Sequence, residues 1–305
     1  MYDVIVIGSG PAGLTAGLYA SRAEMKTLII AGPAPGGQLT ITSEVENYPG
    51  FPEAILGPEL MNKMLAQSIR FGATLVQETV VRVDFRNRPF HVQTDKANYE
   101  GRTVIIASGA DAKWLGLSSE QKLRGHGVSA CATCDGFFFK GKEVVVIGGG
   151  DSAMEEALFL TKFASKVTIL HRSDQFRASK IMLSRAKANP KIVFRPNAQV
   201  VEVLGVDKVT GVRIKNPTTE KEIEFLTEGV FLAIGHQPNT SVFQGQVDLD
   251  EKGYLKVGNN TLTSVPGVFS AGDVADHRYR QAVTAAGLGC MAAMDAEKLL
   301  TQEKG

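Results

Sequence analysis

The 305-residue sequence has only three cysteines, and this scarcity excludes a fold held together by a disulfide framework. It also has no excess of either charge, because 33 lysines and arginines stand against 32 aspartates and glutamates, for a net charge of +1. Without a basic stripe that could follow a phosphate backbone, we expect no nucleic-acid partner. No apolar run approaches the length of a membrane span. The N-terminal residues lack the charged segment and the cleavage site of a signal peptide, so we expect a cytoplasmic protein.

What the sequence does contain is the composition of an ordinary globular protein. Hydrophobic residues make up 44% and charged residues 21%, and the mean hydropathy is −0.01. A chain of this length exceeds what one hydrophobic core usually supports. We therefore expect two compact domains.

The first motif is a glycine-rich turn close to the N-terminus. The apolar run D-V-I-V-I predicts a strand buried on both faces, and G-S-G-P-A-G and a helical pattern follow it. Gly8 permits a tight turn, Gly10 lets a pyrophosphate approach the backbone, and Gly13 lets the helix pack close to the strand. The free N–H groups at the start of the helix favour phosphates. The motif predicts a dinucleotide-binding βαβ unit.

The same arrangement recurs roughly 140 residues later, which indicates a duplicated domain type. The run E-V-V-V-I leads into G-G-G-D-S-A, and Gly148, Gly150 and Ala153 fit the G-x-G-x-x-A pattern. The second strand of the first unit ends in an uncharged A-G-P, whereas that of the second unit ends in H-R-S-D-Q-F-R at 171–177. Arginine at this place favours NADP over NAD, because the guanidinium matches the geometry of a 2′-phosphate. We expect NADPH in the second unit and FAD in the first, with a solvated basic loop as the alternative for 171–177.

Two of the three cysteines, Cys131 and Cys134, stand between the two glycine motifs. A C-x-x-C pair is typical of a redox dithiol or of half a zinc site. Zinc would need four ligands, and only Cys290 and five scattered histidines remain. Because a dithiol beside a flavin needs no further ligand, redox chemistry is the stronger prediction and no metal is expected. Cys290 is predicted to be a buried small residue.

With these motifs in place, the chain resembles low-molecular-weight thioredoxin reductases, the class II pyridine nucleotide-disulfide oxidoreductases, nearly from end to end. Besides the two glycine motifs and 171–177, the resemblance rests on G-G-Q-L-T at 36–40, E-V-E-N-Y-P-G at 44–50, S-A-C-A-T-C-D-G-F-F at 129–138, P-G-V-F-S-A-G-D-V at 266–274 and Y-R-Q-A at 279–282. It implies an α/β fold of two Rossmann-like three-layer domains, the second inserted in the first. We expect a FAD-binding domain over 1–112 and 245–305 and an NADPH-binding domain over 113–244, with crossings in turn-rich stretches near 107–113 and 233–239.

The resemblance also implies which residues bind the cofactors. The implied set is Gly8, Ser9, Gly10, Pro11, Ala12, Gly13, Ala31, Gly32, Gly36, Gly37, Gln38, Leu39, Asn47, Ala107, Ser108, Gly109, Gly148, Gly149, Gly150, Asp151, Ser152, Ala153, His171, Arg172, Arg177, Gly235, Gly272, Asp273, Arg280, Gln281 and Ala282. Asp273 is implied on the ribityl and pyrophosphate side of FAD, and residues 280–282 at the pyrimidine end of the flavin ring. Ser173 stands where relatives commonly have a second arginine, which leaves the affinity for NADPH open.

The implied reaction passes electrons from NADPH to FAD, then to the Cys131–Cys134 disulfide, and then to thioredoxin, in a homodimer whose domains rotate between steps. Cys134 is implied to face the flavin and Cys131 to exchange with thioredoxin. Asp135 is implied to move a proton, although a turn aspartate is the alternative. The run Phe137–Phe139 could dock thioredoxin, but core packing is the stronger prediction for it.

Three other functions stay open from the sequence. A reductase could use a donor other than NADPH, which Ser173 allows. A flavin-containing redox sensor would need no turnover at the cysteines. A dithiol oxidase using oxygen would have little need for Arg172 and Arg177.

Overall fold

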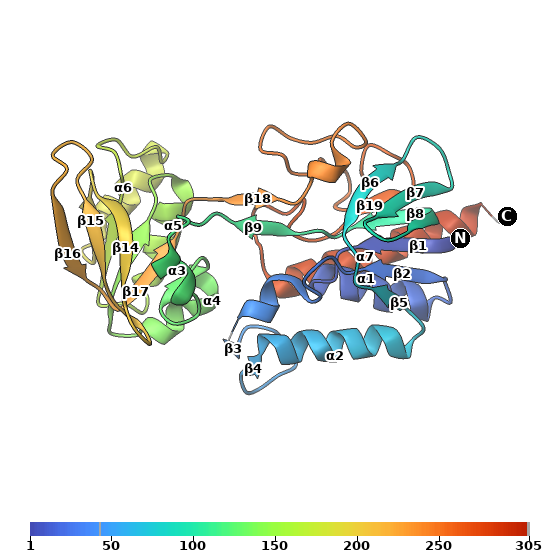
Figure 1. The fold of residues 1–305 in the computed structure, drawn as a ribbon, viewed down its shortest axis with the longest axis horizontal. Coiled ribbons are helices and arrows are strands. Elements are labelled where there is room, and N and C mark those ends of the chain that lie inside the picture. Colours follow the sequence, from blue (N-terminus) through green and yellow to red (C-terminus); the bar gives the residue numbers. More distant parts are fainter. Residues whose placement is uncertain (43, 304–305) are drawn as a thin grey trace. The chain divides into compact units, whose positions relative to one another are not determined.

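The structure is a computed structural model that describes residues 1–42 and 44–303, and the chain folds into two compact units. Unit 1 comprises Met1–Asp111 and the chain from Gln237 onward, and unit 2 comprises Ala112–His236. Two short paired strands make the crossings, β9 (Ala110–Ala112) and β18 (His236–Pro238) (Figure 1). Both lie in the turn-rich stretches noted in the sequence, and the expected boundary at residue 245 lies downstream of the second crossing.

Unit 1 is built on a seven-stranded sheet. Its strands, in hydrogen-bonded order, are β5 (Thr74–Val76), β2 (Thr27–Ile30), β1 (Tyr2–Ile7), β8 (Asn98–Ile106), β7 (Phe90–Thr94) and β6 (Val80–Asp84), and β19 (Val268–Ser270) also pairs with β8. β1 is parallel to both of its neighbours, whereas β6 and β7 form an antiparallel extension. The central strands are continuous apolar runs because both faces of the sheet are covered.

Helices cover one face of this sheet. They are α1 (Pro11–Arg22), α2 (Gly57–Arg70) and the C-terminal α7 (Ala282–Gln302). α1 and α7 pack very closely, since a Cβ added to Gly289 of α7 would lie 2.1 Å from the carbonyl oxygen of Ala12. The other face packs against a second apolar cluster that includes Phe85, Phe90 and Phe243. The smaller elements of the unit are η1 (Gly37–Ile41), β3 (Glu44–Val45), β4 (Ile55–Leu56) and η3 (Ser241–Phe243).

Unit 2 has three layers around a five-stranded parallel sheet. The sheet order is β10 (Val128–Ser129), β17 (Gly229–Leu232), β11 (Glu143–Ile147), β12 (Lys166–Leu170) and β13 (Ile192–Arg195). One face packs against α5 (Asp151–Leu160) and α6 (Lys180–Ala188). The other packs against an antiparallel sheet of β14 (Gln199–Gly205), β15 (Val209–Lys215) and β16 (Glu222–Leu226). Short helices α3 (Ser118–Lys122), α4 (Ala132–Asp135) and η2 (Gly136–Phe139) complete the unit.

In each unit a glycine turn joins a central strand of the sheet to the helix that follows it, β1 to α1 and β11 to α5. Both turns lie at the carboxyl ends of parallel strands, where open α/β sheets bind their ligands. Within residues 1–42 and 44–303, no helix is both long and apolar enough to cross a membrane.

Candidate active site and dinucleotide sites

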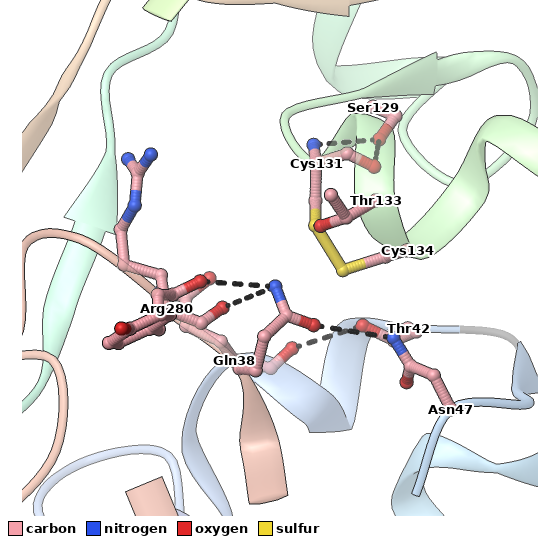
Figure 2. The surroundings of a disulfide bond; sticks show 10 residues. Gln38, Thr42, Asn47, Ser129, Cys131, Thr133, Cys134 and Arg280 are labelled. Atoms are coloured by element: carbon pink, nitrogen blue, oxygen red, sulfur yellow. Dashed lines mark hydrogen bonds between the residues drawn. A yellow bond between two sulfur atoms is a disulfide. The ribbon is translucent and has the colours of Figure 1, made fainter. Parts of the chain in front are cut away.

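Cys131 and Cys134 form a disulfide in unit 2, in the segment between β10 and β11 (Figure 2). The chain makes a single helical turn here, because the N–H groups of Cys134 and Asp135 both donate to the carbonyl of Cys131, at 3.2 and 3.1 Å. This turn places the two Cα atoms 5.3 Å apart. The N–H of Cys131 donates to the hydroxyl of Ser129 at 3.0 Å, which anchors the start of the turn to β10. The predicted redox pair is therefore formed by local backbone geometry.

The disulfide is accessible from solvent. Cys134 is exposed and Cys131 is half-buried. The hydroxyl of Thr133 lies 3.3 Å from the Cys131 sulfur, and Thr133 is itself exposed. An external thiolate can therefore reach this bond without unfolding of the segment.

The carboxyl group of Asp135 directly follows the disulfide and is largely withdrawn from water. This burial raises the pKa of Asp135 above its ordinary value, and a hydrogen bond with Ser129 opposes part of the rise. A carboxyl with a raised pKa keeps its proton at a higher pH than a surface aspartate does. Asp135 is therefore suited to protonate a thiolate that leaves at Cys131 or Cys134.

The three phenylalanines after the disulfide divide between core and surface. Phe139 is buried, and its ring packs edge-on against Phe231 at 5.0 Å. Phe137 and Phe138 remain 55% and 37% exposed and contact each other. The sequence-based preference for core packing holds for Phe139 alone, and the other two rings form an apolar surface next to the cysteines.

The first glycine turn of unit 1 has the three roles that its spacing predicts. A Cβ at Gly8, where φ is +117°, would lie 2.1 Å from the carbonyl oxygen of Ala107. A Cβ at Gly13 would lie 2.0 Å from the carbonyl oxygen of Gly8, so the helix packs directly on the turn. In contrast, a Cβ at Gly10 would meet no described atom within 4 Å. Gly10 therefore presents bare backbone to the side from which a pyrophosphate would approach.

Ser9 brings a second glycine-rich loop to this turn. Its hydroxyl donates to the carbonyl of Ala31 at 3.1 Å and accepts from the N–H of Gly36 at 3.0 Å. A Cβ at Gly37 would lie 3.4 Å from the Cα of Gly10. The 31–39 loop, which contains the predicted residues Gly32, Gln38 and Leu39, is thus held against the glycine turn. Pro11 and Ala12 are the first two residues of α1, which follows the turn.

Asp273 is a half-buried residue beside the same turn, and the Oδ1 atom of its carboxyl group is buried. A Cβ at Gly272 would lie 2.9 Å from the Cβ of Ala12, so the 272–273 backbone lies against the start of α1. The buried Oδ1 of Asp273 has no hydrogen-bond partner. Burial, reinforced by the charge of Asp276 and opposed by Arg280, raises the pKa of Asp273 to about 7. A buried acceptor without a donor fits a ligand that supplies hydroxyl groups.

Other predicted residues of unit 1 are joined by side-chain hydrogen bonds. The amide of Asn47 donates to the side-chain oxygen of Gln281 at 3.3 Å, and Gln281 precedes α7, whose first residue is Ala282. Arg280 has a φ of +50°, a left-handed conformation that costs energy for a residue with a side chain. The site therefore holds its backbone in a special geometry immediately before α7.

Sequence reasoning missed two polar residues at the crossings. Asn239 donates from its side chain to the carbonyl of Ser108 at 3.1 Å, and its N–H donates to the carbonyl of Gly109 at 3.0 Å. Asp111 accepts a hydrogen bond from the amide of Gln38 at 2.5 Å. The only sequence signal for Asn239 was its place directly after Pro238. Asp111 had no sequence signal.

The second glycine turn, in unit 2, repeats the geometry of the first. A Cβ at Gly148 would lie 2.4 Å from the carbonyl oxygen of Ala233 and 2.9 Å from the Cβ of Ala153. A Cβ at Gly150 would again meet no described atom within 4 Å. Asp151 and Ser152 begin α5, and Gly235, at a φ of +98°, follows β17. This turn therefore also fits a pyrophosphate.

The loop after β12 contains the three residues expected to surround a 2′-phosphate, His171, Arg172 and Arg177, and they differ in their exposure to solvent. Arg172 and Arg177 are exposed, and among residues 1–42 and 44–303 no carboxylate forms an ion pair with either guanidinium group. His171 is buried, only 6% exposed, and its ring covers Gly149. Two cations are thus available to an anion, whereas the imidazole is part of the packing.

Cys290, predicted to be buried, is only half-buried. It lies on α7 next to Gly289, which faces α1, so the cysteine itself stands at the edge of that helix contact. Its sulfur lies 3.9 Å from the sulfur of Met294.

Comparisons with known proteins agree with this geometry. A family model described as pyridine nucleotide-disulphide oxidoreductase matches residues 2–289. A thioredoxin reductase of Mycolicibacterium smegmatis is 54% identical over 304 residues, which cover 99% of this chain and 98% of that protein. A thioredoxin reductase of Rickettsia conorii (strain ATCC VR-613 / Malish 7) is 56% identical over 305 residues, 98% of each chain.

Among solved structures, the crystal structure of thioredoxin reductase from Streptococcus pyogenes MGAS5005 superposes with a TM-score of 0.95 at 42% identity and covers 99% of both chains. The predicted fold class, α/β with two Rossmann-like domains, is confirmed by this likeness and by the parallel sheets of the two units.

Proposed function

Because the chain belongs to the pyridine nucleotide-disulphide oxidoreductase family, we propose that it is an NADPH-dependent thioredoxin-disulfide reductase that uses FAD. The observation that carries the proposal is the accessible Cys131–Cys134 disulfide with the half-buried Asp135, whose pKa is raised, beside it. Its place in the same unit as the second glycine turn supports a reaction driven by a pyridine nucleotide. The near full-length similarity to thioredoxin reductases supports thioredoxin as the substrate.

We assign FAD to unit 1 and NADPH to unit 2. The first glycine turn and the 31–39 loop support a flavin dinucleotide, and the unpartnered Oδ1 of Asp273 would accept a ribityl hydroxyl. The exposed guanidinium groups of Arg172 and Arg177 would bind the 2′-phosphate of NADPH. Bound at these places, the two cofactors supply the electron pair that reduces the disulfide.

The cysteines then exchange this pair with the substrate. Reduction of the Cys131–Cys134 disulfide consumes two electrons and two protons and leaves two thiols. The thiolate of Cys131 attacks the disulfide of thioredoxin, so that a mixed disulfide forms and one thioredoxin thiolate leaves. The thiolate of Cys134 next attacks the Cys131 sulfur, which restores the internal disulfide and releases the second thioredoxin thiolate. The similarity to the family supports this order of the two sulfurs.

Asp135 supplies the proton for a departing thiolate and recovers it when a thiol is deprotonated. Its raised pKa supports this role, because the protonated form persists closer to neutral pH. The exposed rings of Phe137 and Phe138 support docking of a protein substrate next to the cysteines. We further propose that the two units rotate about the paired strands β9 and β18 between steps.

A homodimer also belongs to the proposal. Tyr19 on α1 and Met291 and Met294 on α7 are exposed on neighbouring helices of unit 1, and a second copy would cover such an apolar surface. Sedimentation of the flavin-loaded protein measures this directly. A cytoplasmic location stays a prediction.

The test is an anaerobic titration of the purified protein followed by its absorbance. Two equivalents of NADPH should reduce both the disulfide and the flavin, and oxidised thioredoxin should restore the oxidised spectrum with release of thiols. Cys134→Ser is the matched variant, which should retain flavin reduction by NADPH but lose thioredoxin turnover. A colourless protein that takes up no flavin, or a reduced flavin that thioredoxin does not reoxidise, would refute the proposal.

The same titration separates the other functions left open by the sequence. A redox sensor would show no turnover with thioredoxin, a reductase with a different donor would stay oxidised in NADPH, and a dithiol oxidase would be reoxidised by oxygen rather than by thioredoxin.

A further inference from the structure

The loop 171–179 of unit 2 is tied at several points to the second glycine turn. The N–H of Arg177 donates to the carbonyl of Gly149 at 2.6 Å. The N–H of Ser179 donates to the carboxylate of Asp151 at 2.7 Å, so the start of α6 is joined to the start of α5. Arg172 and Arg177 therefore extend from a loop whose backbone is held against the turn that would bind the pyrophosphate.

His171 holds this loop from the inside. Its ring lies over Gly149, where an added Cβ would be 2.4 Å from the Cε1 atom and 2.5 Å from Nδ1, and it packs against the ring of Phe176 at a centroid distance of 5.1 Å. Burial lowers the pKa of His171, and the charges of Arg172 and Arg177 lower it further. The imidazole is therefore neutral and enclosed rather than a cationic phosphate ligand.

The Nε2 atom of His171 is hydrogen-bonded within the loop. Nε2 lies 3.1 Å from the carbonyl oxygen of Gln175 and 2.8 Å from the hydroxyl of Ser173. Because a carbonyl can only accept, we place the hydrogen on Nε2. This N–H then donates to the carbonyl of Gln175 and to the hydroxyl oxygen of Ser173, and the Ser173 hydroxyl donates to the Gln175 carbonyl at 3.4 Å.

Ser173 is therefore turned toward His171, and its backbone is fixed as well. Its carbonyl accepts from the N–H of Asn197 at 3.2 Å, next to the bond from the N–H of Ala198 to the carbonyl of His171 at 2.8 Å. These contacts join the loop to the segment between β13 and β14. The side chain at position 173 thus serves the loop itself and adds no charge to its outer surface.

We propose that His171 and Ser173 are positioning residues that hold the loop carrying Arg172 and Arg177, and that these two guanidinium groups alone bind the 2′-phosphate. This inference rests on the proposed NADPH site in unit 2. It predicts that the preference for a 2′-phosphate depends on residues that do not contact it.

The experiment measures binding rather than turnover. Calorimetric titrations of the oxidised, flavin-loaded protein with adenosine 2′,5′-bisphosphate and with 5′-AMP give a ratio of dissociation constants that isolates the 2′-phosphate. The variants are His171→Phe, which keeps a ring over Gly149 but loses the N–H donor, Ser173→Ala, and the two combined. Arg172→Gln serves as the control that removes one proposed ligand.

We expect His171→Phe to lower the phosphate preference about three- to ten-fold, the size of one lost hydrogen bond, and Ser173→Ala to lower it about two-fold. The double variant should be no worse than His171→Phe, because both residues act through the same bond. Ser173 is exposed, so Ser173→Ala tests the inference even if His171→Phe fails to fold.

Two outcomes are distinguishable from each other. If Arg172→Gln lowers the preference while His171→Phe leaves it unchanged, or if the two positioning variants act independently and multiply, the positioning role is wrong. If the unmodified protein shows no preference and Arg172→Gln changes nothing, the assignment of NADPH to unit 2 itself fails.

Discussion

The buried carboxylate of Asp273 predicts that the affinity for FAD rises with pH. Without a ligand, its pKa lies at about 7 instead of 3.8, chiefly because burial penalises the charge. A shift of about three units corresponds to about 4 kcal/mol between the protonated and ionised forms. Since the folded pKa is raised, this carboxyl costs the apoprotein nothing below about pH 4, and its cost to folding stability grows as the pH rises toward 7.

A ribityl hydroxyl that donates to Oδ1 would stabilise the ionised form and lower this pKa. Binding of FAD would then release a proton below pH 7, so the dissociation constant should fall as the pH rises from 5.5 and level off above about 7. The slope approaches ten-fold per pH unit where the free protein is protonated and the complex is ionised. Asp273→Asn cannot ionise, and it should bind FAD with an affinity nearly independent of pH.

The assay is the quenching of flavin fluorescence when apoprotein is titrated into FAD between pH 5.5 and 8.5. Asp276→Asn is the matched control, because it removes a neighbouring charge that raises the pKa of Asp273. It should keep the pH dependence but move the plateau to lower pH. A flat profile for the unmodified protein, or the same slope in Asp273→Asn, would refute the reasoning.

Four further predictions follow from other parts of the two sites. Asp135→Asn should slow the reduction of thioredoxin about 100-fold or more in stopped-flow measurements, as expected for loss of a general acid, while leaving the reduction of flavin by NADPH unchanged; an equal loss in both steps would argue against a proton-transfer role. Gly10→Leu should abolish FAD binding and leave the far-ultraviolet circular dichroism unchanged, because no described atom lies near its Cβ; retained flavin would show that the turn is not the pyrophosphate site. Phe139→Ala should lower the free energy of unfolding by about 3–5 kcal/mol in denaturant titrations, whereas Phe137→Ala should change stability little and raise KM for thioredoxin; the reverse pattern would contradict their burial. The midpoint potential of the cysteine pair, measured against a glutathione buffer, should lie within a few tens of mV of thioredoxin's, about −270 mV, and a value above about −200 mV would contradict thioredoxin as the main substrate.

The residues that could be read from the sequence are those whose role depends on their neighbours along the chain. Gly8 and Gly10 belong to a turn whose steric demands are local, so their spacing, together with the apolar run before them and the helical pattern after them, predicted the strand, the turn and the helix. Cys131 and Cys134 meet within a single helical turn, and the coiling of the two residues between them brings their sulfurs together. Fold class and the existence of two dinucleotide turns followed from such local patterns.

Residues that act across the fold could not be read in the same way. Nothing in H-R-S-D-Q-F-R distinguishes the buried imidazole of His171 from the exposed guanidinium of Arg172, since the difference arises only when the loop closes over Gly149. Asn239 joins the 108–109 turn from a segment more than a hundred residues away, a separation at which a single sequence carries no signal.

The sequence by itself therefore determined the class of fold, the two glycine turns and the redox cysteines, because each depends on bond geometry and side-chain size within a few residues. Only the tertiary structure decided that the Oδ1 atom of Asp273 is buried without a hydrogen-bond partner, that Phe139 is in the core while Phe137 is not, and that His171 is buried over Gly149. Burial is set by what distant segments place around a side chain, and that environment exists only in the folded chain.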